Sequence, residues 1–137
     1  RINQLRKVHK WMPVAKEMGP MIRELMQHPE KGLLGARTFV SGRDVMLVQY
    51  WRSFEDLERF ARDRDDLHLP AWRRFNKRVG TDGTVGIWHE TYEARPGSYE
   101  NVYVNMPAFG LGKAGTLVEA KAGLQSASGR LGRTVAE

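Results

Sequence analysis

The chain has 137 residues, a formal net charge of +6 and no cysteine. This length fits one domain with an ordinary core, and the absence of cysteine excludes disulfides, thiolate metal sites and cysteine nucleophiles. Basic and acidic residues alternate, as in the run 59–66, which favours a solvated mixed-charge face over a nucleic-acid surface. No apolar run approaches the ~20 residues of a membrane span. We therefore expect a cytoplasmic protein without nucleic-acid or membrane partners.

The first predicted element is a helix over residues 9–28. Its apolar residues recur near the spacing of one helix face. They are Trp11, Ala15, Met18, Ile22, Leu25 and Met26. Pro13 suits a first helical turn. Gly19 and Pro20 predict a kink or a break, because proline lacks the amide donor and clashes with the preceding turn.

Two strands joined by a turn are predicted next, over residues 33–40 and 45–51. The second strand is an almost uninterrupted apolar run, which predicts burial on both of its faces. Ser53 precedes two acidic residues in a pattern that resembles a capping box. A helix is therefore predicted to begin at residue 54.

The second half of the chain contains a predicted helix pair and two further strands. An apolar stripe starting at Phe54 is followed by the charged run 62–66 and by a second stripe, with Pro70 in its first turn. The glycine-bounded turn 80–83 leads into a predicted strand over residues 84–94, and a last strand is predicted over residues 99–105. We expect residues 1–120 to form the domain and residues 121–137 a flexible tail.

This order of elements predicts an α+β fold of ferredoxin-like type, an antiparallel sheet with helices on one face. The plan needs a strand before the first helix, and residues 1–5 are too short for it. The sequence also lacks an initiator Met, so we expect it to start inside that strand. The bare face of such a sheet would be apolar, and its simplest cover is a second copy. We therefore expect a homodimer that forms a dimeric α/β barrel.

Four histidines are candidates for chemistry, and each also has an ordinary structural explanation. His9 and His28 lie near the ends of the first helix, where a solvated or end-capping role is favoured. His68 stands where the helix restarts, so it either caps that end or points into an apolar cavity. His89 alternates with apolar neighbours, so it is either a satisfied core residue or a group with a readily shifted pKa.

Four ordered motifs carry a resemblance that spans residues 45–113. They are YWRSFEDLERF at 50–60, His68-Leu69, Trp88-His89-Glu90 and YENVYVN at 99–105. They resemble the C-terminal half of the haem-dependent aldoxime dehydratases, in which the two histidines have the same separation, 21 positions in this chain. The pattern looks closer still to a short bacterial family of unassigned function that is labelled monooxygenase-like.

The resemblance implies roles for both histidines. His68 would be the axial ligand of haem iron through a neutral ring nitrogen, and His89 a general acid or base near the open iron position. Trp51, Trp72 and Trp88 would shape the pocket of a small hydrophobic substrate. The dehydratases take a distal serine and arginine from the half that has no counterpart here, so nitrile-forming dehydration is not supported.

The resemblance also leaves a route without haem. Monooxygenase-like relatives often need neither metal nor flavin, because an electron-rich substrate in a dry pocket can itself reduce oxygen. His89 would then deprotonate the substrate. The leading hypothesis is thus a monooxygenase-type oxidoreductase of the dimeric α/β-barrel class, with a haem-bound variant. An aldoxime-dehydratase-like haem lyase, a non-catalytic module for haem or another hydrophobic ligand, and a purely structural dimer are the alternatives.

Overall fold

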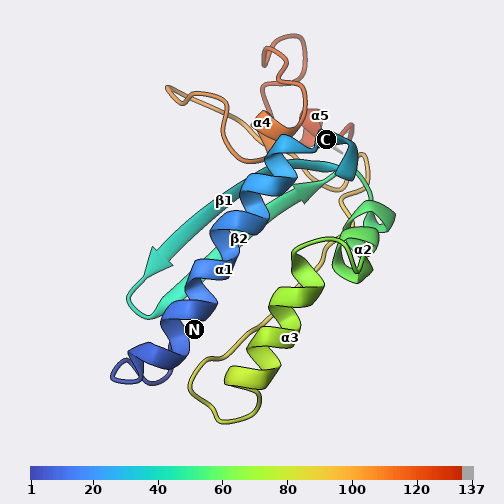
Figure 1. Cartoon of the computed structure of the whole chain (residues 1–137). Helices are drawn as coiled ribbons and strands as arrows, with labels where there is room; N and C mark the ends of the chain where they lie inside the picture. Colours follow the sequence, from blue (N-terminus) through green and yellow to red (C-terminus); the bar gives the residue numbers. More distant parts are fainter. Residues whose placement is uncertain (134–137) are drawn as a thin grey trace. The chain divides into compact units, whose positions relative to one another are not determined.

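The computed structural model describes residues 1–133, which fall into two compact units (Figure 1). The first unit, residues 1–89, contains α1 (Val8–Gln27), the 3-10 turn η1 (Pro29–Lys31), β1 (Leu33–Ser41), β2 (Asp44–Trp51), α2 (Phe54–Arg62) and α3 (His68–Arg78). The second unit starts at residue 90 and contains the short helices α4 (Leu111–Ala114) and α5 (Ala127–Arg130). Among the helices described, none is both long enough and apolar enough to cross a membrane.

Helix α1 runs unbroken through both of its prolines, so the predicted break at Gly19 and Pro20 is wrong, whereas the alternative, a kink, stays a prediction. Pro13 also lies inside the helix rather than in its first turn. A proline removes one intrahelical hydrogen bond, and the packing of the apolar face offsets that loss. Met21 and Leu25 bury this face.

The strands β1 and β2 form an antiparallel hairpin, as predicted, with a register irregularity between Leu33 and Gly35. In Figure 1, α1 lies along this hairpin. One face of the hairpin joins the core. The buried core residues are Leu25, Leu33 and Phe60, and Ile22, Ala36 and Trp51 pack against them. The helices thus cover one face of the sheet, as the sequence predicts.

The opposite face of the hairpin is not covered by these helices. Phe39 and Met46, which are cross-strand partners, are both exposed. The prediction that β2 is buried on both faces is therefore wrong for the single chain. Its outer residues are exposed or half-buried, because the helices pack only against the face that carries Ala36 and Trp51.

The strands predicted over residues 84–94 and 99–105 do not form, and the sheet of the described chain has two strands. Val85 alone makes an isolated antiparallel bridge, with Ile2. The amide of Ile2 donates to the Arg43 carbonyl over 2.9 Å, and that of Gly86 to the Arg1 carbonyl over 2.9 Å. The bridge ends there because alternating side chains make a strand only where a neighbouring backbone supplies partners.

The observed architecture is thus α+β, with a two-stranded antiparallel sheet and helices. Completion to a ferredoxin-like sheet, the dimeric barrel and the division into a domain of residues 1–120 and a tail stay predictions. Of the predicted tail, residues 134–137 lie outside the described part of the chain.

The start of α2 confirms the predicted cap. Ser53 is the N-cap residue, and its hydroxyl accepts a hydrogen bond of 3.2 Å from the Asp56 amide. The Asp56 side chain is buried and accepts hydrogen bonds from Arg52 at 2.8 Å and from Arg59 at 3.0 Å. These bonds fix the first turn of α2 and, through it, the position of Phe60.

Candidate functional site

His68 is the first residue of α3 and is half-buried. Its Nδ1 lies 3.1 Å from the carbonyl oxygen of Ala61, in the last turn of α2. Because a carbonyl can only accept a hydrogen bond, we assign the proton of the neutral ring to Nδ1. The Nε2 atom then carries a free lone pair, which is the form of imidazole that binds metals.

The ring of His68 continues a row of aromatic side chains drawn from three elements. Its centroid lies 5.7 Å from that of Phe60 on α2, with the planes inclined by 54°. Phe60 in turn lies 5.7 Å from Trp51 of β2. The Trp51 indole donates a hydrogen bond of 2.9 Å to Gln49. We refer to Trp51, Phe60 and His68 as the aromatic row, and it joins two of the five predicted site residues.

The other predicted site residues lie outside this row. Trp72 is exposed and stacks on Phe75 of its own helix at a centroid distance of 5.4 Å. Trp88 and His89 follow the Val85 bridge and are exposed. In the described residues, no hydrogen bond or ring contact joins His89 to His68. The catalytic role of His89 and the pocket roles of Trp72 and Trp88 stay predictions.

Glu24, Lys31 and Asp66 form a charged cluster, in which Asp66 is two residues before His68 in the sequence. The sequence analysis did not predict this cluster. The Lys31 ammonium donates to Glu24 over 2.6 Å and also contacts the buried Asp66. The hydrogen bond from Lys31 lowers the pKa of Glu24. Burial works against the charge of Lys31, but its bonds to Asp66 and Glu24 prevail and raise its pKa. Asp66 belongs to the charged run 62–66, whose pattern predicts a solvated surface.

The Lys31 ammonium already occupies the centre of this cluster, so the cluster is poorly suited to bind a second cation. One oxygen of Glu24, Oε2, is buried without a hydrogen-bond partner. Across the residues that the structure describes, no group of three or more histidine and acidic side chains is arranged to hold a metal ion. The cluster therefore works as an anchor that ties α1, η1 and the segment before α3 together.

Two hollows have no residue of the aromatic row in their lining. One, of about 390 Å³, is lined by Arg74, Lys77 and Arg78 at the end of α3. Glu17 of α1 neutralises Arg74 through two bonds of 2.7 Å, and the hydrogen bond from Arg74 lowers the pKa of Glu17. Cations in a last helical turn also offset the negative end of the helix dipole, which explains this basic group without a ligand.

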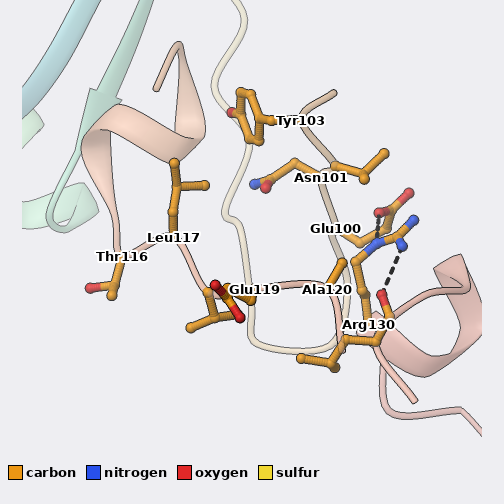
Figure 2. A pocket seen from close by; sticks show the side chains of 11 residues that line it. Glu100, Asn101, Tyr103, Thr116, Leu117, Glu119, Ala120 and Arg130 are labelled. Carbon is orange, nitrogen blue, oxygen red and sulfur yellow. Dashed lines mark hydrogen bonds and ion pairs between the residues drawn. The ribbon is translucent and has the colours of Figure 1, made fainter. Parts of the chain in front are cut away.

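The second hollow belongs to the second unit and has a volume of about 400 Å³ (Figure 2). It lies between residues 100–103 and residues 116–130 and contains none of the predicted site residues. We refer to it as the groove. The Arg130–Glu100 ion pair, at 2.6 Å, lies at its edge. Nothing in the glycine- and alanine-rich end of the sequence predicts it.

Comparison with known proteins adds the family. The sequence model of the family described as "Monooxygenase af470-like" matches residues 1–111. The chain belongs to this family. The protein named Monooxygenase af470 from Aspergillus fumigatus is 32% identical in an alignment 130 positions long, and the alignment covers 80% of this chain and 46% of that protein.

These af470-like monooxygenases thus support the monooxygenase-like part of the resemblance. They give no support for a bacterial grouping or for the aldoxime dehydratases. The chain spans less than half the length of the curated relative that it matches. No solved structure matches the chain.

Proposed function

We propose that the chain is a monooxygenase-type enzyme that acts on a small hydrophobic substrate, with His68 as the residue that binds its cofactor. The family supports the reaction type. The observation that carries the site is the hydrogen bond from His68 Nδ1 to the Ala61 carbonyl, which leaves Nε2 available as a ligand atom.

Haem is the cofactor for which His68 is suited. A ligating histidine nearly always donates its other ring N–H to a carbonyl or carboxylate, and Ala61 supplies that partner here. When bound, haem iron would supply the activation of oxygen. Phe60 packs against the imidazole and restricts its rotation. The ring is therefore already ordered before the cofactor binds, which lowers the entropy cost of binding. His89 would move a proton to or from the substrate.

The test is a haem titration followed by absorption spectroscopy, with two variants at His68. His68→Ala removes both ring nitrogens. In His68→Asn the side-chain amide takes the place of Nδ1 and keeps a donor for Ala61, but it has no counterpart of Nε2. We expect a one-to-one Soret band in the wild type and its loss or shift in both variants, with His9→Ala as the control for an exposed histidine.

The two variants separate ligation from structure. If His68→Asn keeps the wild-type spectrum, the ring nitrogen is not the ligand. If His68→Ala has lost only the ligating ring and has kept its fold, added imidazole should restore its Soret band. If the wild type binds no haem specifically, the axial-ligand role is refuted, and the form that needs no cofactor becomes the proposal to test by oxygen consumption with candidate substrates.

A non-catalytic module for haem or another hydrophobic ligand is the second candidate, and the exposure of His89 favours it. A solvated imidazole has neither the dry surroundings nor the fixed partner that general acid–base catalysis uses. Comparing His89→Ala with the wild type distinguishes the two. Loss of turnover with retained binding in His89→Ala supports the enzyme, whereas a wild type that binds the ligand but turns over no candidate substrate supports the module.

We further propose that the enzyme is a homodimer, paired through the uncovered face of the hairpin. Phe39 on this face is 47% exposed, and its cross-strand partner Met46 is 44% exposed. A second copy would remove these apolar side chains from water. Val40, the next residue, is 71% exposed on the opposite face and provides a matched control.

Sedimentation equilibrium tests the pairing. Phe39→Asp places a charge in the proposed interface and should convert a dimer to a monomer at micromolar concentration. Val40→Asp should leave the dimer intact. A wild type that is monomeric at high concentration, or equal effects of the two substitutions, would refute this interface.

A further inference from the structure

The groove of the second unit has apolar walls that are open to solvent. Its walls include Val102, Leu117, Val118 and Leu124, of which the first three are exposed. Its volume of about 400 Å³ is within the range of small-molecule sites. Exposed apolar side chains that gather in a concave surface mark an interaction site more often than the same residues scattered singly.

Both sides of the groove are held in place by hydrogen bonds. The Tyr103 hydroxyl donates to the Phe109 carbonyl over 2.5 Å and accepts from the Gly112 amide over 2.8 Å. The Arg130 side chain is 15% exposed, and its Nε donates a hydrogen bond of 2.6 Å to Glu100. Its Nη1 donates to the carbonyls of Leu124 and Gln125, with a distance of 3.0 Å in both bonds. A groove with fixed walls binds without the loss of freedom that ordering them would cost.

The charges that line the groove neutralise one another. Glu100 is paired with Arg130, and Glu119 contacts Lys121 as an ion pair. Asn101 differs from these charged groups, because its side chain, like the Thr116 hydroxyl, makes no hydrogen bond to any other described residue. Figure 2 shows its amide pointing from the segment 100–103 toward the side of Leu117. One amide presents both a donor and an acceptor.

From this combination we propose that the groove is a binding site for a neutral, largely apolar small molecule that carries one hydroxyl or carbonyl group. The apolar part lies against Val102 and Val118, and the polar group bonds to the Asn101 amide. Anions and cations bind less well, because every charge at the groove already has its counter-charge. The site is independent of His68 and of the proposed oxygenase function.

The probe is Nile red, a neutral apolar dye with a carbonyl acceptor, titrated into the full chain and followed by its fluorescence. Saturable binding should be weakened at least tenfold by Val118→Asp. The matched control is Val104→Asp, since Val104 is 73% and Val118 72% exposed but only Val118 lines the groove. Circular dichroism of both variants should match the wild type, because neither side chain is buried.

Displacement of the dye tests the chemical class. 1-Decanol should displace it, whereas decanoate and decyltrimethylammonium should be weaker by tenfold or more. Asn101→Leu should weaken the binding of both the dye and decanol about fivefold each, the loss of one hydrogen bond. Equal effects of Val118→Asp and Val104→Asp, equal displacement by decanoate, or dye binding that depends on Phe39 instead would each overturn the proposal.

Discussion

Gly32 is the residue whose substitution tests the packing around the candidate site most directly. It follows η1 with φ at +93°, and a Cβ built there would lie 2.6 Å from the Cβ of Asp56. Gly42, in the β-hairpin turn, has φ at +57° and no atom within 4 Å of such a Cβ. Alanine at either position should cost about 1–2 kcal/mol of unfolding free energy for the left-handed backbone. Only at Gly32 must Asp56 also move.

Moving Asp56 loosens its hydrogen bonds to Arg52 and Arg59. Both arginines are largely exposed, so we assign about 1–3 kcal/mol to this loss rather than the full cost of a buried unpaired charge. Gly32→Ala should therefore cost about 2–5 kcal/mol in total. With a urea dependence of about 1.5 kcal/mol/M, the unfolding midpoint should fall by about 0.7–1.3 M for Gly42→Ala and by about 1.3–3.3 M for Gly32→Ala.

Urea unfolding followed by far-ultraviolet circular dichroism measures both midpoints. In an Asp56→Gly background no side chain has to move, so the cost of displacing Asp56 disappears. Gly32→Ala should then lower the unfolding free energy by no more than Gly42→Ala does. Equal midpoints for the two alanine variants in the wild-type background would refute the reasoning, because they would mean that no side chain stands against Gly32.

Three other substitutions or conditions test separate parts of the structure. Phe60→Leu should cost about 1–2 kcal/mol, because it removes two ring contacts of the aromatic row, whereas Phe54→Leu on the exposed side of α2 should cost less than about 0.5 kcal/mol in the same urea assay. Ser53→Ala should cost about 1 kcal/mol through loss of the cap and lower the thermal midpoint without changing the fold. The pKa values of Glu17 and Glu24 lie below the ordinary 4.5 in the folded chain, so their stabilisation is complete above that pH and is lost as the pH falls through the lowered values; thermal melts should show this decline, and Glu17→Gln should make it shallower.

The features that the sequence predicted correctly are local. Ser53 and the acids after it lie within one helical turn, and the cap that they form needs no distant partner. The hairpin turn around Gly42 and the first turn that holds Pro70 were predicted for the same reason. Each of these features follows from backbone preferences of a few neighbouring residues.

The features that failed depend on distant contacts. The alternation of residues 84–94 is that of a strand, but a strand also needs a paired backbone, and in the described chain residues 1–4 pair only with residues 84–86 of this segment. Pro20 fails in the opposite sense, since packing keeps α1 continuous where local preference predicts an interruption. Asp66 is buried because Lys31 reaches it across 35 positions of the chain, a contact that no local pattern encodes.

The environment of His68 lies between these two cases. Its place at a helix start could be read from the sequence, but its hydrogen bond could not, because Ala61 belongs to the end of another helix. The last carbonyls of a helix lack partners within it, so His68 Nδ1 completes α2 in the way that a capping side chain does. This structural role and the proposed ligand role use different nitrogens. The capping bond even favours ligation, because it fixes the tautomer whose Nε2 can bind a metal. A structural histidine and a cofactor ligand are therefore compatible at this position, and only a variant that keeps the capping donor and removes Nε2 can tell them apart.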